Sequence, residues 1–151
     1  MKASDLKTYR RKLPHWRLEG RVYFVTWRLA KTQPCLHPEE RTLVADAITH
    51  FDGQRYELLA YVVMDDLVHV LAFPYANHSL DKILHSWKSF SAKVIRRIGE
   101  RTVPVWQDEY FDRIVRDEAE LIQKAGYIVG NPVRRWPEIE DYPWVWLGSL
   151  E

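Results

Sequence analysis

The stretch YVVMDDLVHVLAFP, residues 61–74, decides the fold of this chain. It holds two apolar runs that are separated by an Asp-Asp pair and closed by Pro74, a pattern typical of two antiparallel strands joined by a tight turn. Neither run alternates strictly between apolar and polar residues, which predicts a central hairpin buried on both faces. The exception is His69, and Leu67 is two positions before it, so we expect both side chains to leave the same face of the strand.

Segments on either side of the hairpin, which spans about 56–73, carry the signals of further elements. Before it, RVYFVTWRL (21–29) is rich in β-branched and aromatic residues and is predicted to be a strand. HPEE (37–40) then opens a helix, because proline suits the first helical position and carboxylates favour the positive end of the helix dipole. Gly53 marks its end.

Three elements are predicted after the hairpin. A long amphipathic helix covers 79–98, and VWQDEYFDRIVR (105–116) is the last strand. The capping box DEAE (117–120) opens a final helix. We expect that helix to end at about Gly130, because the residue before Pro132 is disfavoured in the helical conformation.

The order β-α-β-β-α-β-α predicts an α+β fold. It is the split βαβ pattern of a ferredoxin-like sandwich with a four-stranded antiparallel sheet, here with an additional C-terminal helix. The length of 151 residues suits a single domain over 1–151. Within it, 1–19 is a basic N-terminal arm without periodicity, and 133–151 is a Trp- and Pro-rich tail expected to pack back on the domain.

Composition excludes several classes of protein. The chain is 46% hydrophobic and 28% charged, which is ordinary for a soluble globular protein. Its single cysteine, Cys35, excludes an internal disulfide. We see no long apolar run and no apolar N-terminal stretch, and so predict a cytoplasmic protein with no membrane partner. There is no phosphate-binding Walker loop, dinucleotide fingerprint or nucleophile elbow.

Charge is unevenly placed along the chain. The net charge of +1 argues against a uniformly basic nucleic-acid binder. Residues 2–17 nevertheless set six basic residues against only Asp5, namely Lys2, Lys7, Arg10, Arg11, Lys12 and Arg17. The helix over 79–98 adds a basic polar face that includes Lys82, Lys93, Arg96 and Arg97. Both features suit contact with DNA phosphates, and both are also typical of solvated surface, so the two interpretations stay open.

The last predicted helix carries a polar face. Gln123, Tyr127 and Asn131 recur at four-residue steps, with Lys124 nearby. A phenolate can attack phosphorus and hold a covalent phosphotyrosine link when something neutralises the phosphate. A metal held by imidazole and carboxamide or carboxylate ligands would do so. On its own such a tyrosine is more often an amphipathic residue at the rim of a core.

Several ordered segments together resemble a known family. They are KLPHW and YFVTWRL near the start, YVVM and VHVL in the hairpin, SLDKILHSWKSFSA in the long helix, and then VWQDEYFDRIVRDEAEL and YIVGNPV. This text resembles the single-tyrosine HUH transposases of small insertion sequences, and most closely the REP-associated tyrosine transposases.

The resemblance implies a function and a set of site residues. It implies binding of single-stranded or hairpin DNA and strand cleavage through a 5′-phosphotyrosine, assisted by a divalent metal, Mg²⁺ or Mn²⁺. By position, Tyr127 would be the nucleophile, and His69 and Asn131 would be metal ligands. Lys88 belongs to a segment that matches the family, and Lys88 and Arg97 are candidates for phosphate contact, as are Arg10, Arg11, Lys12 and Lys93. Relatives work as dimers or as monomers, so either a homodimer or a monomer is compatible.

Two departures from the family pattern fall in the metal site. Leu67 stands where the family has the first histidine, and Asp65-Asp66 stands where it has Pro-Asn. An apolar side chain cannot donate a lone pair, and losing even an outer partner of a metal site typically costs about 10–100-fold in affinity or activity. Asp65 is a candidate replacement ligand, since oxygen ligands suit Mg²⁺ or Mn²⁺. The alternative is that the Asp pair is an ordinary turn facing solvent and His69 a hydrogen-bonded strand histidine.

Three hypotheses follow for the function. The first is a transposase-like enzyme with Tyr127 as nucleophile and a degenerate metal site. The second is a catalytically inactive, domesticated DNA-binding protein. The third is a structural or protein-binding remnant.

Overall fold

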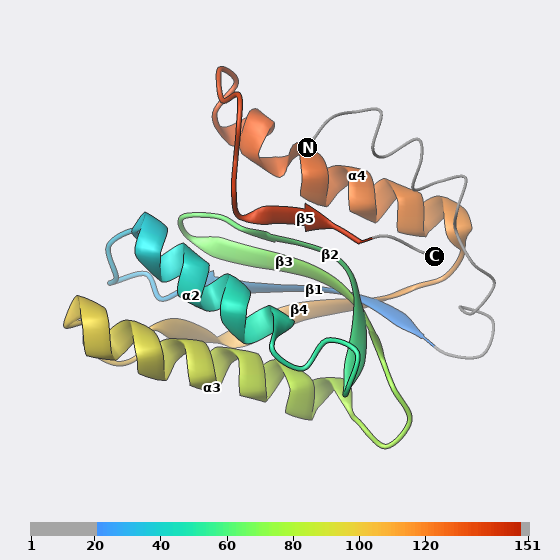
Figure 1. The fold of residues 1–151 in the computed structure, drawn as a ribbon, viewed down its shortest axis with the longest axis horizontal. Coiled ribbons are helices and arrows are strands. Elements are labelled where there is room, and N and C mark those ends of the chain that lie inside the picture. The colour runs from blue at the N-terminus through green and yellow to red at the C-terminus, as the bar shows by residue number, and fades with distance from the viewer. Residues whose placement is uncertain (1–20, 149–151) are drawn as a thin grey trace.

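A five-stranded antiparallel sheet organises residues 21–148, the part of the chain that this computed structural model describes (Figure 1). The elements along the chain are β1 (Val22–Leu29), α2 (Pro38–Thr49), β2 (Tyr56–Val63), β3 (Leu67–Pro74), α3 (Leu80–Gly99), β4 (Trp106–Val115), α4 (Glu118–Arg135) and β5 (Val145–Leu147). The strands lie in the order β4-β1-β3-β2-β5, and every neighbouring pair is antiparallel. The predicted α+β fold with its split βαβ order is confirmed.

The sheet is covered by helices on both faces. Figure 1 shows α2 and α3 on one side of it and α4 on the other. The central strand β3 supplies both cores: Val68 and Val70 pack with α2 and α3, whereas Leu67 and Leu71 pack with α4. Burial on both faces explains why the hairpin sequence lacks polar alternation. No helix within residues 21–148 has the length and apolar character that a membrane crossing requires.

The structure corrects the predicted end of the last helix. Helix α4 continues through Pro132 to Arg135, where we expected it to stop at about Gly130. A proline within a helix removes one backbone donor, and the ladder resumes after it, because the Trp136 N–H donates to the Pro132 carbonyl at 2.7 Å. Burial of Asn131 and Pro132 against the rest of the fold holds this turn in place.

The tail contributes a fifth strand that the sequence did not reveal. Strand β5 pairs with the outer edge of β2, with Val145 opposite Val62 and Trp146 opposite Tyr61. The Trp146 ring stacks on that of Tyr61 at 5.9 Å between centroids. The tail therefore packs back on the domain, and it closes one edge of the sheet.

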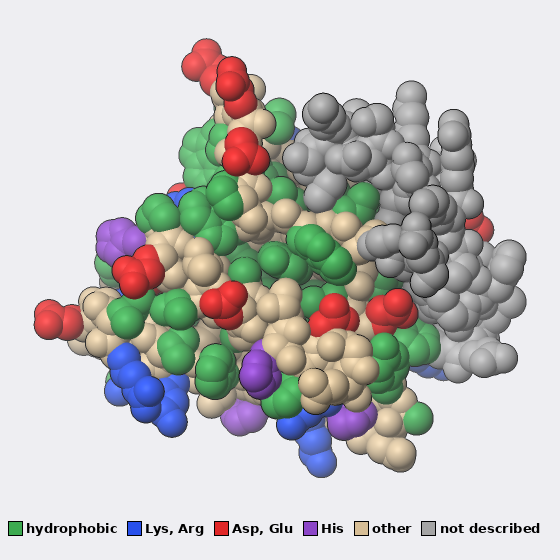
Figure 2. Space-filling model, in the orientation of Figure 1, with side chains coloured by type: hydrophobic (Ala, Val, Ile, Leu, Met, Phe, Trp, Pro, Cys, Tyr) green, Lys and Arg blue, Asp and Glu red, His purple; other side chains and the backbone are tan. Residues whose placement is uncertain are grey.

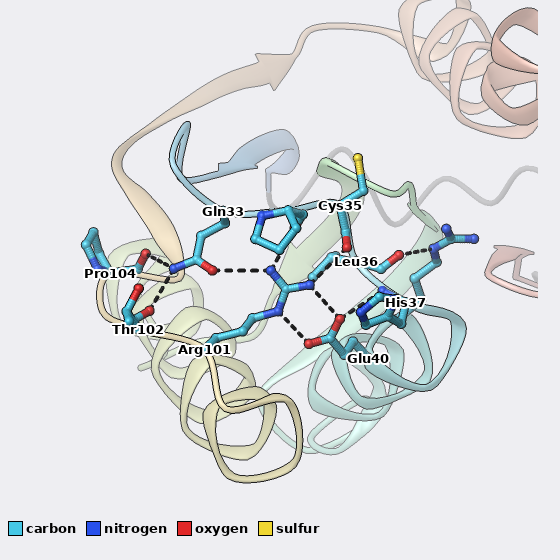
Figure 3. A network of polar contacts seen from close by, with 10 residues as sticks. Gln33, Cys35, Leu36, His37, Glu40, Arg101, Thr102 and Pro104 are labelled. Carbon is cyan, nitrogen blue, oxygen red and sulfur yellow. Dashed lines mark hydrogen bonds and ion pairs between the residues drawn. The ribbon is translucent and has the colours of Figure 1, made fainter.

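A buried ion pair joins the start of α2 to the segment after α3 (Figure 3). The Arg101 guanidinium donates to both carboxylate oxygens of Glu40, at 2.5 and 2.7 Å, and also to the carbonyls of Pro34 and Cys35. The same carboxylate accepts the backbone N–H of His37 at 2.8 Å, which caps α2. Both side chains are almost fully buried, so each charge depends on the other for its solvation.

Hydrogen bonds and ring contacts of Trp87 and Tyr56 join α3 to the sheet and to α2. The Trp87 indole N–H donates to the Tyr56 hydroxyl at 2.9 Å, and that hydroxyl donates to the Ile48 carbonyl at 2.5 Å. The Trp87 ring also stacks on Trp27 of β1 at 5.8 Å. Burial raises the pKa of the Tyr56 phenol, so it stays a neutral donor.

Candidate active site

A cavity of about 500 Å³ opens between α4 and the face of the sheet that carries β1 and β4. Phe24, Thr26 and Arg28 alternate along β1, so their side chains point to this side, and all three line the cavity. From α4 the lining includes Lys124 and Tyr127. The cavity thus lies where α4 leaves part of the sheet uncovered.

His69 lies at the inner wall of this cavity and is 4% exposed. It is directly opposite Thr26 in the β1–β3 pairing, and its Nδ1 is 2.6 Å from the Thr26 Oγ1. The imidazole stacks on Phe24 at 5.3 Å between centroids. Its Nε2 is buried and has no hydrogen-bond partner within the part of the chain that the structure describes. One ring nitrogen is therefore hydrogen-bonded, and the other has no hydrogen-bond partner among the described residues.

The environment of His69 keeps the imidazole neutral. Burial lowers its pKa to about 3, and the positive charges of Arg28, Arg134 and Lys124 act in the same direction. The group is therefore uncharged at neutral pH. It can offer either a lone pair or an N–H at Nε2, but not a positive charge.

Tyr127 stands beside His69 at the mouth of the cavity. Its side chain is 44% exposed, and its ring lies edge-on to the imidazole, with 5.2 Å between centroids. The Arg134 guanidinium lies 4.4 Å from the centre of the Tyr127 ring and donates to the Tyr127 main-chain carbonyl. The phenol is thus accessible to a large ligand while its ring is fixed from two sides.

Three cations around Tyr127 lack a carboxylate partner. Within residues 21–148, Arg28, Lys124 and Arg134 form no ion pair, and Lys124 Nζ lies 5.0 Å from the centre of the Phe24 ring. Other arginines near α4 are neutralised, since Arg113 pairs with Glu120 at 3.0 Å. One carboxylate, Glu109, is also among the residues that line the cavity. Positive charge remains in excess at this site.

The structure places the predicted metal-site residues in different surroundings. Leu67 is buried in the apolar cluster under α4. Asp65 binds Arg135 and lines a different cavity, beside Trp136 and Tyr142. Asn131 is buried one turn beyond Tyr127 and is not part of the lining. Among residues 21–148 no three His, Cys, Asp or Glu side chains gather in a group that could hold a metal ion.

The candidate DNA-contacting residues lie in different places. Lys88 donates to the Gln107 carbonyl at 2.8 Å and so joins α3 to β4, and burial lowers its pKa. Lys93 and Arg97 are exposed on α3, on the opposite side of the sheet from Tyr127. In Figure 2 basic side chains gather along the edge occupied by α3, while acidic ones mark the loop between α4 and β5. Arg10, Arg11 and Lys12 lie outside the described residues.

Sequence reasoning missed three residues of this site. Thr26 and Arg28 share a strand face with Phe24, which alternation could have shown, but their position opposite β3 depends on strand register. Arg134 was missed because the helix was expected to stop before it. It lies seven residues after Tyr127, two helical turns along the same face.

Comparison with known proteins gives one family and a consistent fold. Residues 21–131 match the family model described as Transposase IS200 like. No curated protein matches the chain. The solved structure of a REP-associated tyrosine transposase bound to a REP hairpin is similar, with a TM-score of 0.69 and 19% identity, over 87% of this chain and 88% of that one. A putative transposase from Deinococcus radiodurans R1 has a TM-score of 0.55 and 22% identity, over 72% and 88%.

The two solved structures show a shared fold at these identities, and the family match covers β1 to the greater part of α4, including His69 and Tyr127. The chain therefore belongs to the IS200-like transposase family.

Proposed function

We propose that this protein binds hairpin or single-stranded DNA and cleaves it through Tyr127. One observation carries the proposal: an exposed phenol stands over a cavity whose surroundings hold three cations that have no carboxylate partner within residues 21–148. A phosphodiester would supply the missing negative charge. The similar transposase bound to a REP hairpin supports DNA as the partner.

The reaction would be a transfer of the phosphoryl group from one oxygen to another. The Tyr127 oxygen attacks phosphorus and forms a P–O bond, and the bond from phosphorus to the 3′ oxygen breaks. The phenol proton is lost and the departing 3′ oxygen gains a proton, so a free 3′-hydroxyl and a 5′-phosphotyrosine result. The reverse attack rejoins the strand, and no further reactant is consumed.

A second candidate function is DNA binding without cleavage. Transposases of this family generally use a divalent metal. With Leu67 in the place of a ligand, the protein side chains around His69 offer few donors to Mg²⁺ or Mn²⁺. A domesticated binding protein would keep the cations and the fold and would lose strand cleavage.

A covalent-adduct assay distinguishes the two. The protein is incubated with a pool of hairpin-bearing single-stranded DNAs in Mg²⁺, in Mn²⁺ or in EDTA, and products are separated on a denaturing gel. We expect an adduct with the parent that falls by at least about a thousandfold, to background, in Tyr127→Phe. Tyr110→Phe is the matched control, since Tyr110 lines the same cavity but its hydroxyl already donates to Asp81 at 2.7 Å.

The other outcomes are equally informative. A salt-sensitive complex on a native gel without any adduct would exclude the enzyme and leave the DNA-binding protein. Adduct formation that survives in Tyr127→Phe would exclude Tyr127 as the nucleophile. If neither binding nor an adduct is observed, both candidate functions are contradicted.

A further inference from the structure

We infer that this chain holds the DNA phosphate at Tyr127 with Arg28, Lys124 and Arg134, in place of a divalent metal ion. The inference rests on the proposed function, and it assigns the charge neutralisation at that site to side chains. Within residues 21–148, His69 has no pair of His, Cys, Asp or Glu partners with which to hold the family's usual metal. Around the cavity the described residues instead include the cations Arg28, Lys124 and Arg134, against the single lining carboxylate of Glu109.

Arg28 lies beside the position of the missing ligand. In the β1–β3 pairing Arg28 is directly opposite Leu67, just as Thr26 is opposite His69. Directly opposite residues have Cβ atoms about 4.5–5.5 Å apart on the same face of a sheet. The Arg28 side chain therefore begins next to the strand position where a histidine ligand would stand. Its positive charge disfavours a cation there.

Lys124 and Arg134 approach from the helix. Lys124 precedes Tyr127 by three residues and therefore lies on the same face of α4, with its ammonium over the Phe24 ring. Arg134 lies over the Tyr127 ring itself. The three charges thus come from β1 and from both sides of Tyr127 along α4. Arg134 can donate two parallel hydrogen bonds to a phosphate.

Gly130 makes room for Arg134. A Cβ atom at Gly130 would stand 2.8 Å from a guanidinium nitrogen of Arg134. Any side chain at this position would push the guanidinium away from its present place without changing any charge. The glycine, which is otherwise unfavourable within a helix, therefore allows Arg134 to lie against α4 between its own turn and Tyr127.

His69 can complete the site without a metal. Its Nδ1 contacts Thr26, so with the Thr26 hydroxyl as donor, Nε2 carries the proton and has no acceptor among the described residues. A phosphate oxygen would accept that proton in a hydrogen bond. The buried nitrogen without a partner is then satisfied by the substrate itself.

The first arm of the test uses pyrophosphate and needs no DNA target. In EDTA, pyrophosphate should raise the melting temperature of the parent, while Mn²⁺ alone should not. The rise should be lost in the triple variant Arg28→Met, Lys124→Met, Arg134→Met and kept in Arg116→Met, which removes an exposed charge next to α4. Stabilisation by Mn²⁺ alone, with none by pyrophosphate in EDTA, would overturn the inference.

The second arm uses hairpin DNA and fluorescence anisotropy. We expect the parent to bind with similar affinity in EDTA and in Mn²⁺, and each single Met variant to bind about 10-fold more weakly, as for loss of one charge-assisted hydrogen bond. The slope of log affinity against log salt should fall by about 0.7–0.9 for each cation removed, which a purely structural residue would not cause. Gly130→Ala should weaken DNA binding although the net charge of the protein is unchanged.

The two arms also separate failure of the inference from failure of the proposed function. DNA binding that requires Mn²⁺, with variants that behave like Arg116→Met, would overturn the inference and keep the proposed function. Pyrophosphate binding in EDTA without binding to any DNA would contradict the proposed function and keep the phosphate site.

Discussion

Replacing Arg101 with methionine should lower the free energy of unfolding by about 3–5 kcal/mol at pH 7. The change leaves the Glu40 carboxylate buried, and the backbone N–H of His37 remains as its hydrogen-bond donor. It also removes the hydrogen bonds that Arg101 donates to the carbonyls of Pro34 and Cys35. Those groups are tied to the start of α2, so the loss weakens the packing of α2 against α3. Urea unfolding followed by circular dichroism measures the effect.

The effect of Arg101→Met should depend on pH. In the parent, burial by itself would raise the pKa of Glu40, but the hydrogen bonds from Arg101 and from the His37 N–H outweigh it and hold the pKa below its usual range. The stability from this carboxylate is therefore present above the ordinary carboxyl pKa, about 4.3, and is lost as pH falls through the lower folded value. In the variant burial is largely unopposed, so we expect the opposite sign, a penalty that grows as pH rises through about 4.3.

The difference between parent and variant should consequently be largest near neutral pH and smallest below about pH 4. Arg97→Met is the matched control, because Arg97 is exposed on the last turns of α3, and it should change stability by no more than about 0.5 kcal/mol. A further change of Glu40→Gln in the Arg101→Met background should recover part of the loss. A difference that is independent of pH would contradict the assignment to Glu40.

Truncation of Trp87 to alanine should lower the free energy of unfolding by about 3–5 kcal/mol. The ring fills the core between α3 and the sheet, stacks on Trp27 and donates to Tyr56, so its removal leaves a cavity and a hydroxyl without its donor. Tyr56→Phe should be milder, about 1–3 kcal/mol, because it removes hydrogen bonds and no ring. Thermal unfolding of the two variants measures both effects.

Phe90→Ala is the control for the tryptophan variant. Phe90 is on the same helix and is as aromatic, but it is 51% exposed. Its loss should fall within about 0.5 kcal/mol of the parent. Equal effects of Trp87→Ala and Phe90→Ala would contradict the structure's placement of α3.

The fold was predictable from local patterns where the pattern has one physical meaning. Two apolar runs that flank Asp65-Asp66 indicate a buried hairpin. The capping signals of α2, α3 and α4 fall within one or two residues of the starts of these helices. The end of α4 was not predictable from Pro132 alone, because a local preference against helix is outweighed by burial of that turn. Strand β5 was missed because three residues carry no periodicity and form a strand only against β2.

The candidate site was predictable to a lesser degree. His69 and Tyr127 were identified separately, and the structure brings their rings together, 5.2 Å apart. Asp65 lies with Arg135 instead, since a turn residue's direction depends on which partner the folded chain supplies. Arg28 and Thr26 face His69 and Leu67 only through the register of β1 on β3, which is a property of the sheet rather than of either strand.

Leu67 also sets a direction for further change in this sequence. Its side chain is part of the apolar cluster that Leu121 and Ala125 of α4 complete. Histidine at this position would bury an imidazole among carbons, at about 1–3 kcal/mol where total stability is about 5–15 kcal/mol. Mutation from histidine to leucine is therefore easier than its reversal. The packing beneath α4 disfavours a histidine at position 67 on grounds of stability alone.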